Sequence, residues 1–267
     1  IIPFNEPFLN EKLKNLFNKE FFINASLEEA IDNSKVIFLC VGTPQNEDGS
    51  ANLNQIIATI TSLLKIINDS EITIVIKSTV PPSTVESKII PFLESKISSK
   101  QKINIAVNPE FLREGKCWED FQNPDRIVIG LTDEKSKRLL SEIYKPFNAP
   151  IHFTSPSTAE FIKYLSNTYL STMISFSNEL AMIGESIPGV DIPKAFKIFH
   201  EDRRWSGSPA NMSSYAYPGA GYGGYCLPKD TQALITVATE HGIHPVILKA
   251  NTKINSKIID FHLKKIT

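Results

Sequence analysis

The stretch Val36-Ile-Phe-Leu-Cys-Val41, followed by Gly42-Thr-Pro44, decides the fold. Its six apolar residues are of the kinds that favour strands, and the run is far too short to cross a membrane. Glycine and proline then end it in a turn. Three further runs have the same character, each leading into a polar turn: Ile72–Lys77, Ile103–Val107 and Arg126–Gly130. This repetition indicates a first half built on short, buried strands.

Helix-like stretches separate these strands, notably Leu53–Asn68 and Thr84–Lys96. Strands alternating with helices predict an α/β fold with a parallel sheet of the Rossmann type. In such sheets ligands bind in the loops that follow the carboxyl ends of the strands. We therefore expect binding residues in four such loops: Gly42–Pro44, Ser78–Pro82, Asn108–Glu110 and Leu131–Asp133.

The pattern changes beyond Thr154. Apolar residues recur every three or four positions from Ile162 to Ile183, which predicts one long, buried helix, with Ser157 or Thr158 as its cap. Shorter helices are expected over three later segments: Ile192–Phe199, Asp230–Glu240 and Pro245–Lys264. We expect residues 1–154 to form the α/β domain and residues 155–267 an all-helical domain.

The composition excludes several classes of protein. The 267 residues are 42% hydrophobic and 21% charged, with a formal net charge of -1, so neither disorder nor a basic surface for nucleic acid or membrane is indicated. Cys40, Cys117 and Cys226 form no disulfide framework and no zinc pattern, and no targeting signal is visible. Reduced thiols in a cytoplasmic protein without a metal are expected.

The densest chemical signal is the segment Pro218–Asp230, where four glycines within six residues precede Cys226. Glycine lets the backbone approach a ligand closely, so we expect binding here. Lys229 and a following helix would favour the thiolate of Cys226. An inert, buried cysteine is the alternative, because free cysteine is among the most buried residue types.

Three other segments carry charged or polar groups. Lys163 and Asn167 are four residues apart on one helix face, where they could hydrogen-bond an oxyanion or simply meet solvent. The loop Asn108–Gly115 holds the carboxylates Glu110 and Glu114, which could equally be surface acids. Lys77–Pro81 could be no more than a strand end with a turn.

Taken in order, these segments resemble a known family. Gly42-Thr-Pro44, Lys77-Ser-Thr-Val-Pro81, Asn108-Pro-Glu-Phe-Leu-Arg-Glu-Gly115, Asn123-Pro-Asp-Arg126, Ala159-Glu-x-x-Lys-Tyr-x-x-Asn167 and Gly221-Tyr-Gly-Gly-x-Cys-x-Pro-Lys-Asp230 are similar to motifs of the UDP-glucose/GDP-mannose 6-dehydrogenases. The resemblance covers nearly the whole chain. It implies an NAD-dependent oxidation of the C6 alcohol of a nucleotide sugar to the uronate, without a metal.

The resemblance also implies roles for individual residues. Cys226 matches the nucleophile that forms a thiohemiacetal and then a thioester. Lys163 and Asn167 match the groups that stabilise oxyanions, Asp230 and Glu110 those that handle protons and water, and Thr79 one that holds a water or hydroxyl near the nicotinamide. The expected NAD contacts are Gly42, Thr43, Pro44, Ser78, Thr79, Glu114 and Lys229. The expected substrate contacts are Glu110, Phe111, Leu112, Arg113, Lys163, Asn167, Tyr215, Tyr217, Gly221 and Gly223.

Two departures from the family pattern matter. An Arg-Ile-Gly segment of the glucose-specific members is replaced here by Ser208–Ser214, so UDP-glucose, a UDP-N-acetylhexosamine and GDP-mannose all stay open as substrates. Family members also carry a GxGxxG strand-turn-helix before the position of Ile1 and a second nucleotide-binding domain beyond that of Thr267. We therefore expect a fragment. The resemblance implies that it forms a homodimer through its helical domain.

The sequence is compatible with two other functions. The chain could be an inactive, dimer-forming scaffold, since the helical domain supplies subunit contacts in the family. A hydroxyacid dehydrogenase of the 6-phosphogluconate type shares the layout, but it needs no cysteine. The run that contains Cys226 argues against that type.

Overall fold

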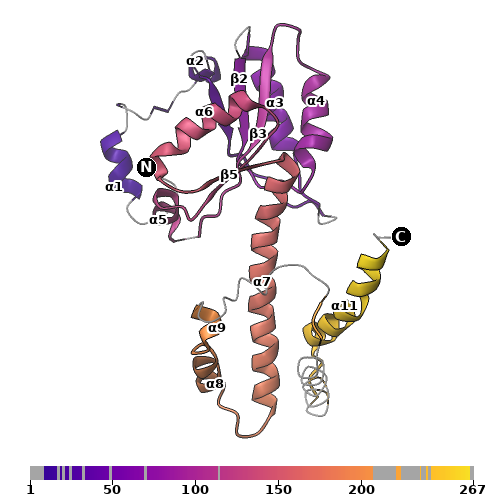
Figure 1. Cartoon of the computed structure of the whole chain (residues 1–267). Helices are drawn as coiled ribbons and strands as arrows, with labels where there is room; N and C mark the ends of the chain where they lie inside the picture. The colour runs from indigo at the N-terminus through magenta and orange to yellow at the C-terminus, as the bar shows by residue number, and fades with distance from the viewer. Residues whose placement is uncertain are drawn as a thin grey trace. The chain divides into compact units, whose positions relative to one another are not determined.

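A computed structural model of the chain is shown in Figure 1. The structure describes residues 9–16, 19, 22–23, 26–31, 34–47, 50–68, 71–113, 115–206, 221–223, 235, 239 and 242–264. The chain divides into two compact units, Ile1–Thr168 and Tyr169–Thr267. The domain boundary that we predict between residues 154 and 155 stays a prediction.

The first unit contains a five-stranded sheet of order β1-β2-β3-β4-β5. Its strands are β1 (Val36–Leu39), β2 (Glu71–Ile76), β3 (Lys102–Val107), β4 (Ile127–Leu131) and β5 (Ile151–Thr154). The first four lie within two residues of their predicted bounds, and β5 was not predicted. The pairs β1–β2, β2–β3 and β4–β5 are parallel, which confirms the fold class.

One strand pair differs from the expectation. β4 runs antiparallel to β3, with Val107 opposite Gly130. β4 therefore runs away from the edge at which β1, β2 and β3 end: its last residue, Leu131, lies opposite Ala106, and the chain that follows leads to Lys135 and Ser136, which contact Glu71 and Thr73 in the first half of β2. The prediction that the loop Leu131–Asp133 shares an edge with the other three loops is wrong for this reason.

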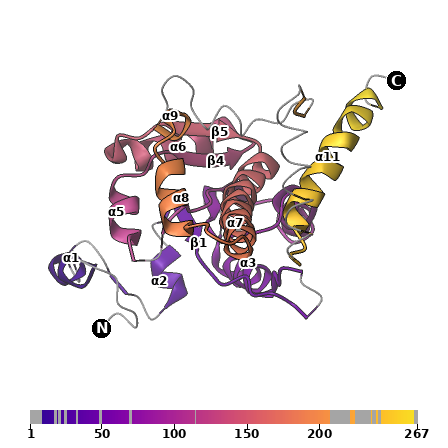
Figure 2. The ribbon, with the colours of Figure 1, turned by 90° about the horizontal axis from the view of Figure 1, so that it is seen from below.

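Helices cover both faces of the sheet (Figures 1 and 2). In β2, Ile72, Ile74 and Ile76 pack with α3 (Asn54–Ile66), the π-helical turn η1 (Val85–Ile89) and α4 (Ile90–Glu94). Val75 points to the other face, where it packs with α6 (Glu134–Tyr144). The side chains of a strand alternate between its faces, so one apolar run fills both cores. Shorter elements complete this unit: α1 (Leu9–Leu16), α2 (Leu27–Ile31), α5 (Cys117–Gln122) and η2 (Lys145–Phe147).

The long helix α7 (Pro156–Ser186) confirms the predicted helical stripe. Its cap is Ser155, whose hydroxyl accepts the Thr158 amide, so the prediction of Ser157 or Thr158 as cap is wrong. A Cβ atom on Gly130 would lie 2.7 Å from the Pro156 Cα atom and 2.9 Å from the Ser155 carbonyl oxygen. Only a glycine in β4 lets α7 begin so close to the sheet.

The expectation that α7 is buried is wrong for the chain alone. Several large apolar side chains of this helix are exposed: Phe161, Leu165, Tyr169, Leu170 and Met182. An apolar stripe predicts that a surface is suited to burial, but it does not say what covers that surface. No helix among the described residues is long and apolar enough to cross a membrane.

The described residues of the second unit contain helices and no strand, as predicted. They include α8 (Ile192–Phe199), α9 (Arg203–Ser206) and α11 (Val246–Leu263). Asp191 caps α8 by accepting the Lys194 amide at 3.0 Å. Ile183, Ile235 and Leu248 form a small core in this unit. The predicted helix over Asp230–Glu240 falls almost entirely outside the described residues.

Candidate functional site

The loops after β1 and β2 hold each other in place at one edge of the sheet. The Thr43 hydroxyl donates to the Thr79 carbonyl at 2.8 Å. The Ser78 hydroxyl lies 2.6 Å from the Val41 carbonyl, to which it donates, and Ser78 is buried. The hydroxyls of Thr43 and Ser78, both predicted to contact NAD, therefore brace the loops in this structure.

A pocket of about 810 Å³ opens beside these loops. Its lining residues are Thr43, Gln45, Asn46, Ser50, Ala51, Asn52, Leu53, Asn54, Pro81, Lys88 and Tyr164. Thr43 and Pro81 come from the loops that follow β1 and β2, and Tyr164 comes from α7. The size suits an organic ligand, and the place is the one where α/β sheets bind dinucleotides. The described residues thus fit part of an NAD molecule.

Asn108 joins four elements at the end of β3. It is 2% exposed, its amide nitrogen donates to the Val128 carbonyl at 2.9 Å, and its amide oxygen accepts from Lys77 Nζ at 3.1 Å. The hydroxyl of Tyr144 donates to the same oxygen. Burial raises the pKa of Tyr144 to about 12, so this group stays a donor. Asn108 thereby fixes the start of the loop that carries Glu110.

Lys163 and Glu110 form an ion pair beside this loop. The Nζ atom of Lys163 lies 2.8 Å from Glu110 Oε1, and the lysine side chain is 8% exposed. The other carboxylate oxygen of Glu110 accepts the Leu112 amide at 2.6 Å. The ring of Phe111 lies 5.6 Å from Lys163 Nζ and 4.5 Å from the Arg126 guanidinium carbon. The structure brings together three predicted site residues, Glu110, Phe111 and Lys163.

Lys77 is a second lysine at this edge of the sheet. Burial lowers its pKa, while nearby Cys40 and Glu110 act in the opposite direction and Lys163 adds to the lowering. Two cations and one carboxylate therefore influence one another here. This clustering follows from the tertiary fold, because residues 77, 110 and 163 are far apart along the chain.

Glu160 lies one turn before Lys163 on α7 and is 1% exposed. Its Oε1 atom accepts the Val85 amide at 2.9 Å, and the amides of Ser83 and Thr84 also favour its charged form. Burial outweighs these hydrogen bonds and raises the pKa of Glu160 to about 7. Its second carboxylate oxygen has no hydrogen-bond partner among the residues that the structure describes. Sequence analysis missed this link between α7 and the segment after β2.

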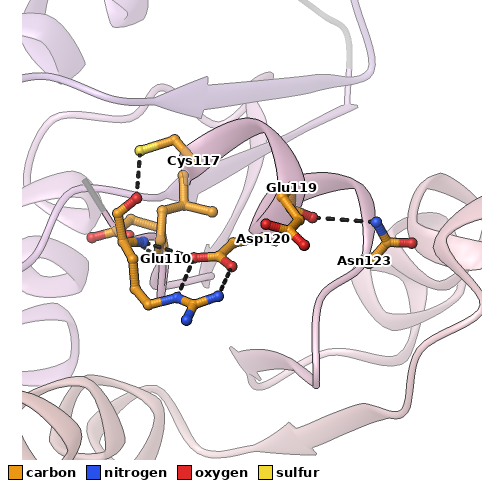
Figure 3. A network of polar contacts seen from close by, with 7 residues as sticks. Glu110, Cys117, Glu119, Asp120 and Asn123 are labelled. Atoms are coloured by element: carbon orange, nitrogen blue, oxygen red, sulfur yellow. Dashed lines mark hydrogen bonds and ion pairs between the residues drawn. The ribbon is translucent and has the colours of Figure 1, made fainter. Parts of the chain in front are cut away.

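Arg113 pairs with Asp120 of α5. Figure 3 labels Asp120 together with Glu110, Cys117, Glu119 and Asn123. Asp120 accepts hydrogen bonds from the Nε atom and from the main-chain amide of Arg113, both at 2.9 Å. The hydrogen bond from the Arg113 side chain holds the pKa of Asp120 at about 2. The guanidinium predicted to bind substrate is thus paired with α5 in this structure.

The remaining predicted residues divide into three groups. Gly42 and Pro44 lie in the loop after β1, where the Gly42 amide donates to Gln55 Oε1 at 3.1 Å and the Pro44 carbonyl accepts the Asn52 amide at 2.8 Å. Asn167 is exposed on α7, one turn beyond Lys163, and Gly221 and Gly223 are exposed in the second unit. The others lie outside the described residues: Glu114, Tyr215, Tyr217, Cys226, Lys229 and Asp230.

Two models of one protein family match the chain, one in each half. Residues 1–148 match the model of the UDP-glucose/GDP-mannose dehydrogenase family, NAD binding domain, and residues 157–257 match that of the central domain of the same family. The chain belongs to the UDP-glucose/GDP-mannose dehydrogenase family. This confirms the resemblance inferred from the motifs, and it confirms NAD as the family's cofactor.

The named relatives of the chain are dehydrogenases of the same family. UDP-glucose 6-dehydrogenase YwqF of Bacillus subtilis is 37% identical over 100% of this chain and 60% of its own length. UDP-glucose 6-dehydrogenase of Rickettsia felis is 40% identical over 96% of the chain and 56% of its own length. The crystal structure of GDP-mannose dehydrogenase from Pseudomonas aeruginosa, in a ternary complex, is 30% identical with a TM-score of 0.87, over 99% of this chain and 61% of that one. The chain spans about 60% of the length of these relatives.

Proposed function

We propose that this protein acts as an NAD-dependent nucleotide-sugar 6-dehydrogenase, which oxidises a C6 hydroxymethyl group to a carboxylate. The observation that carries the proposal is the Lys163–Glu110 pair at 2.8 Å, at the edge of the sheet where the family's ligands are expected. When bound, NAD+ accepts a hydride in each of the two oxidations. Thr43 and Pro81, which line the pocket, are the residues that we expect to hold it.

The proposal assigns the covalent step to Cys226. Attack of its sulfur on the C6 aldehyde forms a carbon–sulfur bond, and the carbonyl oxygen takes up the proton that the thiol gives up, which yields a thiohemiacetal. Loss of the C6 hydride and of the hydroxyl proton converts this adduct to a thioester. Water then breaks the carbon–sulfur bond and releases the carboxylate and the thiol. The covalent adduct keeps a reactive aldehyde on the protein. A thiol nucleophile must stay reduced, so the proposal includes a cytoplasmic location.

The charged groups have distinct roles in this scheme. Lys163 has three N–H donors, and Glu110 accepts from one of them, so the ammonium can also donate to an oxyanion on C6. Asn167 on the same helix would add a second donor. Glu110 and Asp230 would move protons and activate water, and Thr79 would hold a water or hydroxyl beside the nicotinamide.

The test of the reaction is uronate formation measured separately with UDP-glucose, a UDP-N-acetylhexosamine and GDP-mannose. We propose a UDP-sugar as the substrate and UDP-glucose as the first choice, because relatives 37% and 40% identical to this chain are named for it. A higher kcat/KM with GDP-mannose would reassign the sugar but keep the reaction. No uronate from any of the three donors would reject the reaction for this chain.

The test of the mechanism is Cys226→Ala, with Cys40→Ala as the matched control because Cys40 is an exposed free cysteine. Cys226→Ala should abolish uronate formation without changing the circular dichroism spectrum. Cys40→Ala should keep most of the activity. Full acid production by Cys226→Ala would disprove the covalent step.

A second candidate function is a dimer-forming scaffold without activity, as an alternative to the enzyme. The second unit exposes apolar side chains on several helices, which favours a homodimeric partner surface: Tyr169, Leu170, Met182, Ile198, Phe199, Val246, Ile254 and Ile259. Titration calorimetry with NAD+ and mass measurement by light scattering separate the two. Tight NAD+ binding contradicts the pure scaffold, and a strict monomer contradicts the dimer.

A further inference from the structure

The segment between β2 and η1 contains a strained turn. The Thr84 amide donates to the Pro81 carbonyl at 3.1 Å, across Pro82 and Ser83. Ser83 has a φ of 70°, in the left-handed region. A proline at the second position and a positive φ at the third are the marks of a type II turn, in which glycine is the favoured third residue. A serine at this angle costs free energy, so other contacts must hold the turn.

Glu160 of α7 supplies these contacts. Its Oε1 atom accepts the Val85 amide at 2.9 Å, and the amides of Ser83 and Thr84 face the same carboxyl group and favour its charged form. Successive amides around a left-handed residue form a concavity that suits an anion. Because Glu160 is 1% exposed, it joins the turn to α7 from inside the protein.

The two elements that Glu160 joins form one side of the pocket of about 810 Å³. Three lining residues belong to them: Pro81 begins the turn, Lys88 lies on η1, and Tyr164 lies one turn beyond Glu160 on α7. Burial raises the pKa of Tyr164, and the charge of Glu160 raises it further, so the two side chains are near neighbours. Glu160 itself is not among the lining residues. It therefore lies behind this wall of the pocket.

We propose that Glu160 is a positioning residue for the cofactor: by holding the strained turn against α7, it sets the place of Pro81 relative to Tyr164 in the pocket. This inference rests on the proposed function, in which the pocket receives part of NAD. Glu86 and the Ser157 hydroxyl also link η1 to α7, but this contact is exposed and water competes for both groups. The buried contact of Glu160 is the one that positions the turn.

The test compares Glu160→Met with Glu160→Gln in the full chain. Methionine keeps the length of the side chain and loses the oxygen acceptor, whereas glutamine keeps an oxygen that can accept the same amides. At pH 6, below the Glu160 pKa of about 7, neutral glutamine is the closest match to the protonated carboxyl group. Glu160→Met should raise the Kd of NAD+, measured by titration calorimetry, at least tenfold. Glu160→Gln should stay within threefold of the wild type.

Kinetics separate positioning of the cofactor from general damage. In Glu160→Met the KM for NAD+ should rise at least tenfold, while kcat at saturating NAD+ stays within threefold, because the reacting groups are unchanged. Glu94→Met is the matched control, since Glu94 is an exposed carboxylate at the end of α4, which continues η1. This variant should match the wild type in Kd, KM and kcat.

Relief of the strain at Ser83 gives an independent prediction. Ser83→Gly lets the turn adopt its backbone angle without support. In the Glu160→Met background it should therefore recover the NAD+ affinity at least threefold. If Glu160→Met does not fold, Ser83→Val replaces it, because a β-branched residue at a φ of 70° strains the turn at an exposed position. Ser83→Val should raise the Kd of NAD+ at least threefold, and an unchanged Kd would contradict the inference.

Three outcomes with a chain that binds NAD+ would overturn the inference. The first is a Kd in Glu160→Met within threefold of the wild type. The second is a lower kcat with an unchanged KM for NAD+. The third is a double variant, Glu160→Met with Ser83→Gly, that recovers no affinity.

A wild-type chain that binds no NAD+ would instead reject the proposed function, and hydrogen exchange then decides whether Glu160 holds the turn. The Ser87 amide donates to the Ser83 carbonyl at 2.9 Å, so its exchange reports the place of the turn. Glu160→Met should speed this exchange at least tenfold, and Glu94→Met should not. Unchanged exchange in Glu160→Met would reject the hold on the turn whatever the pocket binds.

Discussion

The ammonium group of Lys163 lies 2.8 Å from the carboxylate of Glu110 and joins α7 to the loop after β3. The lysine side chain is almost fully buried, while that of Glu110 is 34% exposed. A buried cation needs a partner to remain charged. Glu110 therefore both anchors α7 and keeps a positive charge available beside the sheet.

Replacing Lys163 by methionine should separate the structural and chemical roles of this pair. The change leaves the Glu110 carboxylate without its cation, so we expect a loss of about 2 kcal/mol in the free energy of unfolding by urea. Uronate formation should fall at least 100-fold. Lys145→Met is the control, because Lys145 and Glu142 form an exposed pair at 3.8 Å, and its unfolding curve should match the wild type. Near-wild-type turnover by Lys163→Met would contradict the assigned role.

Asn108→Ala should be among the more damaging changes in the first unit. It leaves the buried Val128 carbonyl, the buried Tyr144 hydroxyl and the partly buried Lys77 without their partner. We expect a loss of about 3 kcal/mol in the free energy of unfolding, measured with urea. Asn104→Ala is the control and should lose much less, since the Asn104 side chain makes one long hydrogen bond of 3.5 Å to Glu71. Equal losses in the two variants would show that the Asn108 junction adds no stability.

Glu160 should make stability fall as the pH rises toward neutrality. Its pKa is raised from 4.5 to about 7 in the folded chain. The folded state therefore binds more protons than the unfolded state between these values, and the stability contributed below pH 4.5 is lost as the pH passes 7. Glu160→Gln removes this titration, so its stability relative to the wild type should increase by about 2 kcal/mol from pH 5 to pH 8.

The check is the melting temperature of both proteins over that pH range. The control is Glu86→Gln, since Glu86 is an exposed carboxylate on η1 close enough to raise the Glu160 pKa. Glu86→Gln should give a smaller change with the same sign. A difference between Glu160→Gln and the wild type that stays constant from pH 5 to pH 8 would show that Glu160 is already charged in the folded state.

The strands were predictable because their apolar runs are short, continuous and bounded by turns. β5 was missed because it has four residues and an exposed His152, so it offers neither a continuous run nor a long alternation. The reversed direction of β4 was also missed, since Ile127–Leu131 reads the same whether its neighbour is parallel or antiparallel. Strand identity is a local property, and strand direction depends on the chain connections.

Site residues were predictable only where a charged or polar side chain comes directly after a strand or recurs along one face of a helix. Glu110 and Lys163 stood out for that reason, and the structure pairs them. Asn108 and Glu160 did not, because a single asparagine or glutamate becomes informative only when its buried partners are known. The cap of α7 was misplaced by two residues or more, as Ser155, Ser157 and Thr158 are chemically equivalent candidates in one short segment.

The antiparallel direction of β4 has a consequence for the evolution and engineering of this chain. It places the turn between β4 and α6 at the edge away from the loops that hold Thr43, Thr79 and Glu110. Length changes between Leu131 and Thr132 can therefore accumulate without altering the chemistry, provided that Asp133 still accepts the Ser136 amide and starts α6. This turn is the natural place to insert an affinity tag or a fluorescent label.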